Sequence, residues 1–216
     1  MTSYSLKDAA TLAEASYSAG RIKKPKVLKS LDLQDVQAHL LDGNILLLPG
    51  SNSVRDYLRF NLRPLRLGHR QFTMNSNDTE KGASGTIWHQ GFLVYARAIF
   101  DWLQAEGVRP NYIIGHSLGA AATQILSKTY NVPAIGFAAP RPKWVKSRVK
   151  NDGKCLLLNR SDDLVPKLPG DFSHMGQAKL LTSLTDRRFL AHSMPRYIQI
   201  VAEAVQSQVL PDKWSG

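Results

Sequence analysis

The sequence predicts an α/β fold with a mostly parallel central sheet and helices on both faces. The first observation behind this prediction is that helix-like and strand-like apolar segments alternate along most of the chain. The second is a β-branched and aromatic run, residues 112–114, which leads through a glycine-flanked turn into the alanine-rich segment Leu118–Tyr130. Alternation of this kind builds parallel strands covered by helices on both sides.

The individual elements follow from hydrophobic periodicity and from turn residues. The Asp42-Gly43 dipeptide favours a hairpin, Ser53 can cap the helix that follows it, and Gly107 ends a long helix. Residues 66–84 lack a clear period and are expected to form a mobile loop. In chain order we expect a helix at Leu6–Ala15, a hairpin through Asp42-Gly43, a strand ending at Leu48, helices at 54–62 and 92–106, strand 112–114, helix Leu118–Tyr130, strands 134–138 and 156–158, and a helix at 197–205.

The turn between strand 112–114 and its helix reads Gly115-His116-Ser117-Leu118-Gly119. A serine at such a turn takes a strained backbone conformation that presents its hydroxyl, while small flanking residues let strand and helix approach closely. The alternative is a glycine-rich turn with a serine that has no chemical role. The strand and helix on either side favour Ser117 as a nucleophile.

A serine nucleophile needs a histidine to take its proton and a carboxylate to orient that histidine. In α/β-hydrolases the acid and then the base follow the nucleophile along the chain. Asp162 and Asp163 stand in a polar turn directly after an apolar strand, and only His174 and His192 lie downstream of Ser117. His192 precedes the last expected helix, and a loop position there suits a base.

At these motifs the chain resembles the class 3 lipases, a family of α/β-hydrolases that includes fungal triacylglycerol lipases and feruloyl esterases. The resemblance implies the α/β-hydrolase fold, Ser117 as nucleophile, Asp163 as acid and His192 as base. Asp162 becomes the second choice for the acid, and His174 matches a family histidine that is usually not catalytic. The segments that carry the resemblance are Leu46-Leu47-Leu48-Pro49-Gly50-Ser51, His89-Gln90-Gly91-Phe92, Gly115-His116-Ser117-Leu118-Gly119-Ala120-Ala121, Phe137-Ala138-Ala139-Pro140-Arg141-Pro142 and Asp163-Leu164-Val165-Pro166-Lys167-Leu168-Pro169.

The same resemblance implies an oxyanion hole built from the backbone N–H groups of Ser51 and Leu118. Such donors stabilise the charge that develops on the carbonyl oxygen of an ester under attack. Leu48-Pro49 departs from the Phe-Arg that the family commonly has before its Gly-Ser/Thr. Gly50-Ser51 can also be an ordinary turn ahead of a helix cap, and both interpretations are compatible.

Composition predicts a single domain over residues 1–216, because a chain of this length with 43% hydrophobic residues buries one core and leaves little room for another. The single cysteine, Cys155, excludes an intrachain disulfide and lies in an apolar run, where we expect a buried hydrophobe. No transmembrane stretch and no Sec-type signal are expected. The compartment stays open between the cytoplasm and export by a non-Sec route.

The formal net charge of +11 raises nucleic acid as a partner, but the basic residues are dispersed and no recognised nucleic-acid motif is present, so none is expected. A basic stripe follows the segment of Ser51, and two interpretations of it stay open. It is either a solvated helix face or a surface that makes transient contact with anionic membranes. Its members are Arg55, Arg59, Arg63, Arg66 and Arg70.

The predicted function is therefore hydrolysis of lipid or other acyl esters by a serine carboxylic-ester hydrolase. The reaction passes through an acyl-enzyme on Ser117 and requires neither a metal nor an organic cofactor. Phospholipase A1 and thioesterase activity are the enzymatic alternatives. An inactive hydrolase scaffold that binds a lipid or a protein partner is the alternative from another class.

Overall fold

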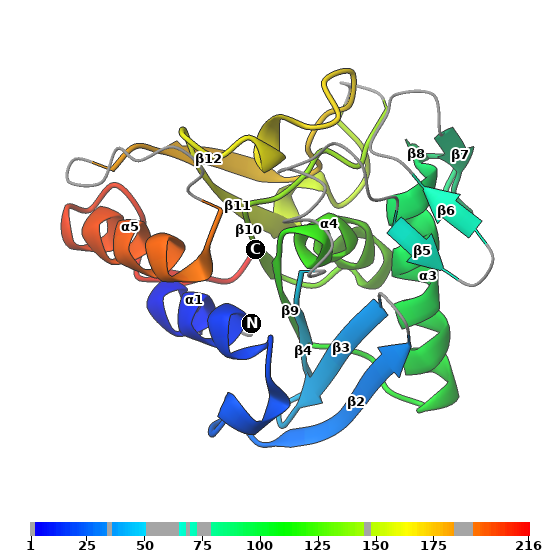
Figure 1. Cartoon of the computed structure of the whole chain (residues 1–216), viewed down its shortest axis with the longest axis horizontal. Helices are drawn as coiled ribbons and strands as arrows, with labels where there is room; N and C mark the ends of the chain where they lie inside the picture. The colour runs from blue at the N-terminus through cyan, green and yellow to red at the C-terminus, as the bar shows by residue number, and fades with distance from the viewer. Residues whose placement is uncertain are drawn as a thin grey trace.

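The computed structural model describes residues 3–33, 36–50, 79–144, 148–183 and 192–216, together with the backbone of 65–67 and 70–72. A central sheet lies between two layers of helices (Figure 1). In the described part of the chain, seven strands pair in the order β12-β11-β10-β9-β4-β3-β2. These strands are β2 (Val27–Leu33), β3 (Val36–Leu41), β4 (Ile45–Leu48), β9 (Tyr112–His116), β10 (Ala134–Phe137), β11 (Cys155–Arg160) and β12 (Gln177–Leu181).

The strand directions confirm the mostly parallel sheet. β4, β9, β10, β11 and β12 run parallel to one another, and β3 is antiparallel to both β2 and β4. The hairpin between β3 and β4 turns at Asp42-Gly43, as predicted. Because β4, β9 and β11 are parallel, the segments that follow them leave the sheet at the same edge.

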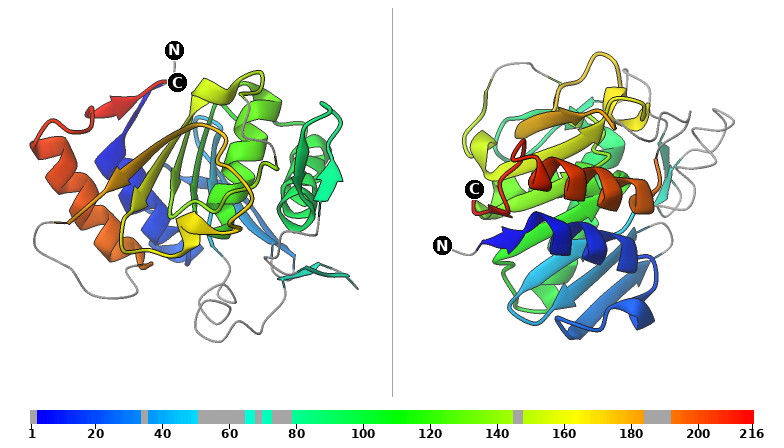
Figure 2. Two further views of the ribbon diagram at one scale, coloured as in Figure 1. Left: turned by 90° about the horizontal axis from the view of Figure 1, so that it is seen from above. Right: turned by 90° about the vertical axis from the view of Figure 1, so that its left-hand side faces the viewer.

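Helices α1 (Leu6–Ala15) and α5 (Met194–Gln206) lie side by side on one face of the sheet, and α3 (Gln90–Ala105) and α4 (Leu118–Tyr130) cover the other (Figure 2). Successive strand residues point to opposite faces. Accordingly Leu46 and Ile113 belong to the core under α3 and α4, whereas Leu47 and Ile114 belong to the core under α1 and α5. The two cores hold the strands in a fixed register.

Short strand pairs complete the described fold. β1 (Tyr4–Ser5) pairs antiparallel with β13 (Lys213–Trp214), and the Leu6 N–H donates to the Asp212 carbonyl at 2.9 Å, so segments from opposite ends of the sequence lie together (Figure 2). The other pairs are local hairpins. They join β5 (Leu65–Leu67) to β6 (Arg70–Phe72) and β7 (Thr79–Lys81) to β8 (Ile87–His89). The described residues also form 3₁₀ turns, namely η1 (Ala19–Arg21), η2 (Asp152–Lys154) and η3 (Val165–Lys167).

Most expected elements are confirmed, and two helices, Leu6–Ala15 and Leu118–Tyr130, have the predicted bounds. The other described helices begin two or three residues earlier than predicted. Within 66–84 the structure describes β6, β7 and part of β5, which are strands of three residues and too short to show a period in the sequence. The mobility of this segment stays a prediction. The helix predicted at 54–62 lies outside the described residues, and the single domain stays a prediction.

Candidate active site

Ser117 lies on the turn between β9 and α4, with φ 54° and ψ −122°. This backbone conformation is rare for a residue with a side chain and costs free energy that the surrounding structure must offset. A Cβ at Gly115 would collide with the Thr123 hydroxyl and the carbonyl of Gly119, and a Cβ at Gly119 would collide with the carbonyls of Leu48 and Pro49. Both glycines therefore allow the close contact of strand and helix that the turn requires.

His192 contacts Ser117 with one ring nitrogen and Asp163 with the other. Its Nε2 lies 2.8 Å from the Ser117 Oγ, and its Nδ1 lies 2.8 Å from the Asp163 Oδ2. An ionised carboxylate only accepts hydrogen bonds, so Nδ1 carries the proton and Nε2 accepts from the serine hydroxyl. The structure thus brings together the three residues that the sequence predicted for this site.

Asp163 is held by further donors and is 1% exposed. The Tyr197 hydroxyl donates to its Oδ2 at 2.8 Å, and the Val165 N–H donates to its Oδ1 at 2.9 Å. The same Tyr197 oxygen accepts from the Arg160 N–H at 3.1 Å, which orients the hydroxyl toward the carboxylate. Charged acceptors with several donors are fixed in position, and Asp163 in turn fixes the ring of His192.

Asp162, the second choice for the acid, has another partner. Its carboxylate binds the buried guanidinium of Arg160 through two contacts, Nε to Oδ1 at 3.0 Å and Nη2 to Oδ2 at 2.8 Å. The hydrogen bonds from Arg160 lower the pKa of Asp162. The structure therefore places Asp163, and not Asp162, at the imidazole.

His174, the second choice for the base, does not contact Ser117 either. Its Nε2 donates to the Ala139 carbonyl at 2.9 Å. Burial lowers the pKa of His174 to about 4, with a smaller contribution from the charge of Arg141. We assign this histidine a structural role.

The depressed pKa of His174 predicts a loss of stability in acid. The unfolded chain, with an imidazole pKa of about 6.5, binds this proton more readily, so the contribution is complete above pH 6.5 and lost as the pH falls toward 4. In urea titrations between pH 7 and 4.5, His174→Gln should flatten the dependence of unfolding free energy on pH by up to about 1.4 kcal/mol per unit. An unchanged slope would contradict this assignment. His116, whose pKa is also lowered by burial, acts in the same direction and remains in the variant.

One of the two predicted oxyanion donors lies in the described part of the chain. Leu118 is the first residue of α4, and among the described residues its N–H has no main-chain acceptor, as is usual at the start of a helix. Ser51 lies outside the described residues. Its predecessor, Gly50, is described, and the Gly50 N–H donates to the Tyr17 hydroxyl at 3.2 Å.

Sequence reasoning missed three residues that contact this site: Tyr197, Tyr17 and His116. His116 stands beside the nucleophile, and its Nε2 lies 3.2 Å from the His192 carbonyl. Because the base follows the nucleophile in the chain order of α/β-hydrolases, the sequence pattern does not mark a histidine that precedes Ser117. No local pattern marks either tyrosine, because their contacts depend on tertiary structure.

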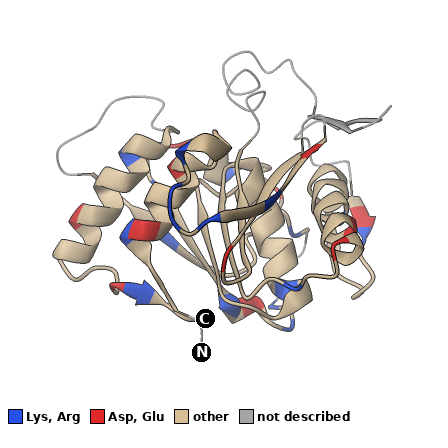
Figure 3. Cartoon of the chain, turned by 90° about the horizontal axis from the view of Figure 1, so that it is seen from below, with Lys and Arg blue, Asp and Glu red and all other residues tan. Residues whose placement is uncertain are grey.

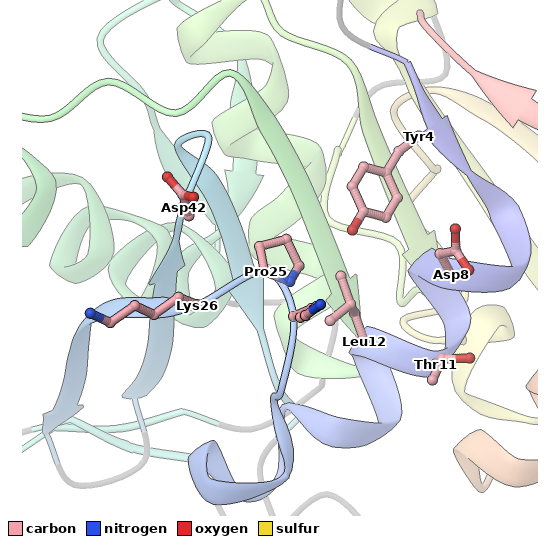
Figure 4. Close-up of a pocket in the computed structure, with 8 residues that line it drawn as sticks. Tyr4, Asp8, Thr11, Leu12, Pro25, Lys26 and Asp42 are labelled. Atoms are coloured by element: carbon pink, nitrogen blue, oxygen red, sulfur yellow. The ribbon is translucent and has the colours of Figure 1, made fainter.

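A cavity on the described surface lies away from the candidate site. This cavity, of about 530 Å³, lies between α1, the segment before β2 and the hairpin at Asp42 (Figure 4). It is therefore at the amino end of β4, away from Ser117. Its lining includes two carboxylates, Asp8 and Asp42, and two lysines, Lys24 and Lys26. Nothing in this mixture selects one kind of ligand.

Charged groups are dispersed over the described strands, helices and loops and do not gather on one element (Figure 3). Arg66 and Arg70 lie on β5 and β6, while the other three arginines of the predicted stripe are outside the described residues. No group of three His, Cys, Asp or Glu side chains in the described ranges is placed to bind a metal. None of the helices described here has both the length and the hydropathy to cross a bilayer.

A mostly parallel sheet with helices on both faces, and a serine on the sharp β9–α4 turn, define the α/β-hydrolase fold. Among solved structures the chain is similar to a Rhizomucor miehei lipase propeptide complex, with a TM-score of 0.51 and 16% identity over 91% of this chain and 78% of the other. It is also similar to the Lip2 lipase of Yarrowia lipolytica, with a TM-score of 0.50 and 15% identity over 87% and 80% of the two chains. A fungal lipase–inhibitor complex has a TM-score of 0.51 and 17% identity over 81% of this chain and 78% of the other.

Sequence comparison adds less than the fold does. No family model matches the chain. A stretch of 91 residues, 42% of this chain, is 23% identical to the Probable polyketide synthase 5 of Dictyostelium discoideum, and it spans 4% of that protein. At these identities the solved structures establish a shared fold.

Proposed function

We propose that this chain is a serine hydrolase that cleaves carboxylic esters of lipids or other acyl compounds. The observation that carries the proposal is the continuous contact from Asp163 through His192 to Ser117, with 2.8 Å at each step. This is the arrangement that makes a serine hydroxyl nucleophilic. Its three members come from turns after β9 and β11 and from the residue before the cap of α5.

In the proposed reaction His192 Nε2 takes the proton of Ser117 as the Oγ attacks the ester carbonyl. The tetrahedral intermediate collapses, the C–O bond to the alcohol breaks, and the imidazolium returns its proton to the departing alkoxide. Water then attacks the acyl-enzyme, with His192 again as the base, and the acid leaves as Ser117 regains its proton. Asp163 keeps Nδ1 protonated and stabilises the imidazolium in both half-reactions.

We propose the Leu118 N–H as one oxyanion donor and the Ser51 N–H as the second. The position of Leu118 at the amino end of α4 supports its role, because the helix dipole adds to the attraction of the amide for negative charge. Loss of one such donor typically costs about 3 kcal/mol of barrier. The assignment of Ser51 depends on the resemblance alone.

The triad chemistry does not select the leaving group. Phospholipids with a cleavable sn-1 ester and thioesters remain alternative substrates, because the same steps apply to any acyl group that reaches Ser117. The non-enzymatic alternative, a binding module on a hydrolase scaffold, predicts the same fold with an unreactive serine. The two classes differ in one measurable property, the reactivity of Ser117.

A fluorophosphonate probe tests this reactivity directly. We expect the wild-type chain to be labelled at Ser117, as located by peptide mass, and Ser117→Ala to remain unlabelled. Hydrolysis of p-nitrophenyl esters from acetate to palmitate, of a phospholipid and of a triglyceride would then define the substrate. A folded wild-type chain that resists the probe would favour the binding module.

A further inference from the structure

A second series of hydrogen bonds, which does not include Asp163, reaches the candidate site. The Gly50 N–H contacts the Tyr17 hydroxyl at 3.2 Å, this hydroxyl contacts His116 Nδ1 at 2.5 Å, and His116 Nε2 contacts the His192 carbonyl at 3.2 Å. Tyr17 follows α1, Gly50 follows β4, and His116 ends β9. Four separate parts of the chain are therefore tied together at the active-site edge of the sheet.

The direction of each bond in this series is determined by its ends. The His192 carbonyl can only accept, so His116 Nε2 must carry a proton and donate it. In a neutral ring Nδ1 is then an acceptor, and the Tyr17 hydroxyl has to donate to it. The Tyr17 oxygen is left to accept from the Gly50 N–H, which can only donate.

His116 is suited to stay neutral. It is buried, and burial, followed by the proximity of His192, lowers its pKa well below the usual value. The rings of His116 and His192 also pack together, with centroids 5.0 Å apart. A neutral His116 keeps the proton on Nε2, where the His192 carbonyl needs a donor.

We propose that Tyr17 and His116 form a positioning relay for hydrolysis, which we call the Tyr17–His116 relay. It holds the main chain of His192 against the turn that carries Ser117, and it holds the Gly50 amide directly before the proposed oxyanion donor Ser51. The relay thereby sets the base and Gly50, the residue after Pro49 at the end of β4, relative to the same strand, β9. This inference rests on the proposed function. It adds Tyr17 and His116 to the site as positioning residues that act through His192 and Gly50.

Such positioning matters because proton transfer depends steeply on geometry. The side chain of His192 is oriented by Asp163, but the main-chain position from which that side chain starts is fixed at the His116 contact. A displacement of about 1 Å can cost about 100-fold in rate. A relay that prevents such a shift contributes to kcat and leaves substrate affinity nearly unchanged.

Tyr17→Phe is the most direct test, because it removes one hydroxyl and keeps the ring. Tyr17 is 40% exposed, so the variant should fold. We expect kcat for a p-nitrophenyl ester to fall by about tenfold, with KM within about twofold of wild type. The matched control is Tyr112→Phe, which also loses a hydroxyl bonded to a distant main-chain carbonyl, that of Trp214, and should keep kcat.

Substitutions at His116 test the same relay from its other end. Gln places an amide donor near the position of Nε2, whereas Leu does not, so His116→Gln should retain about tenfold more kcat than His116→Leu. His174→Gln, another buried histidine that donates to a carbonyl, should alter stability but not kcat. In Tyr17→Phe/His116→Leu the losses should not multiply, because each change breaks the same series.

The outcomes separate the relay from the proposed function. If the wild type reacts with the fluorophosphonate but Tyr17→Phe matches Tyr112→Phe in kcat, the relay is wrong and the hydrolase proposal stands. Losses that appear only in KM, or that multiply in the double variant, also overturn the relay. A wild type that does not react overturns the function from which the relay was inferred.

Discussion

Replacing Ser117 with alanine should lower the hydrolysis of p-nitrophenyl esters by at least about 10⁴-fold, the order of loss seen when a triad nucleophile is removed. The substitution deletes one oxygen from a side chain that is 1% exposed and leaves a Cβ that experiences the same backbone strain. The fold should therefore persist. The measurement is initial rate against enzyme concentration, with circular dichroism and melting temperature recorded for both proteins.

Ser127→Ala provides a matched control for this variant. Ser127 is also a buried serine on α4, but its hydroxyl donates to the Val132 carbonyl at 2.8 Å, at the far end of the helix. Its loss should cost stability of about 1 kcal/mol and leave the rate unchanged. Ester hydrolysis that survives in Ser117→Ala at a level near this control would remove Ser117 from the mechanism.

Asp163→Asn should lower kcat by about 10³- to 10⁴-fold, whereas Asp162→Asn should change it by less than about threefold. An asparagine at 163 offers His192 Nδ1 either a poorer acceptor or an N–H donor, and a donor there would favour the wrong tautomer. Asp162 instead neutralises Arg160. Its replacement should reduce the free energy of unfolding by about 1 to 2 kcal/mol, because its side chain is partly exposed and the charge of Arg160 is buried.

Adjacent aspartates make this comparison internally controlled, since both variants lose one negative charge from the same turn. Kinetics and urea unfolding should be measured together, because the two substitutions are expected to act on different quantities. If Asp162→Asn were the catalytically damaged variant, the acid would be Asp162, and the contact between His192 and Asp163 would not persist during turnover.

The core elements could be predicted from sequence because their residues carry strong local signals. Leu118–Tyr130 follows a glycine turn and is buried over most of its length, and Leu6–Ala15 begins after a Ser5 side chain that accepts from the Asp8 N–H. The strands at both edges of the sheet, β2 and β12, were not predicted. Their residues are mostly exposed, so neither an apolar run nor a clean alternation marks them.

The candidate site divides in the same way. The turn motif predicted Ser117, chain order limited the acid to Asp162 or Asp163 and the base to His174 or His192, and the resemblance to the class 3 lipases selected Asp163 and His192. Tyr17 contacts His116, and Tyr197 contacts Asp163, across 99 and 34 residues of sequence. A single sequence carries no local signal for such contacts, since the partner of a tyrosine hydroxyl can lie anywhere on the fold.

The packing of α1 against α5 has a consequence for biosynthesis. The ribosome releases α1 about 180 residues before α5, yet the two helices cover each other's apolar sides on the same face of the sheet. During translation the leucine and alanine side of α1 lacks its contacts with α5 until α5 has been synthesised. Contacts between residues so far apart in sequence slow folding. The nascent polypeptide therefore exposes an amphipathic segment with an apolar side that a chaperone can bind until the carboxyl-terminal helix emerges.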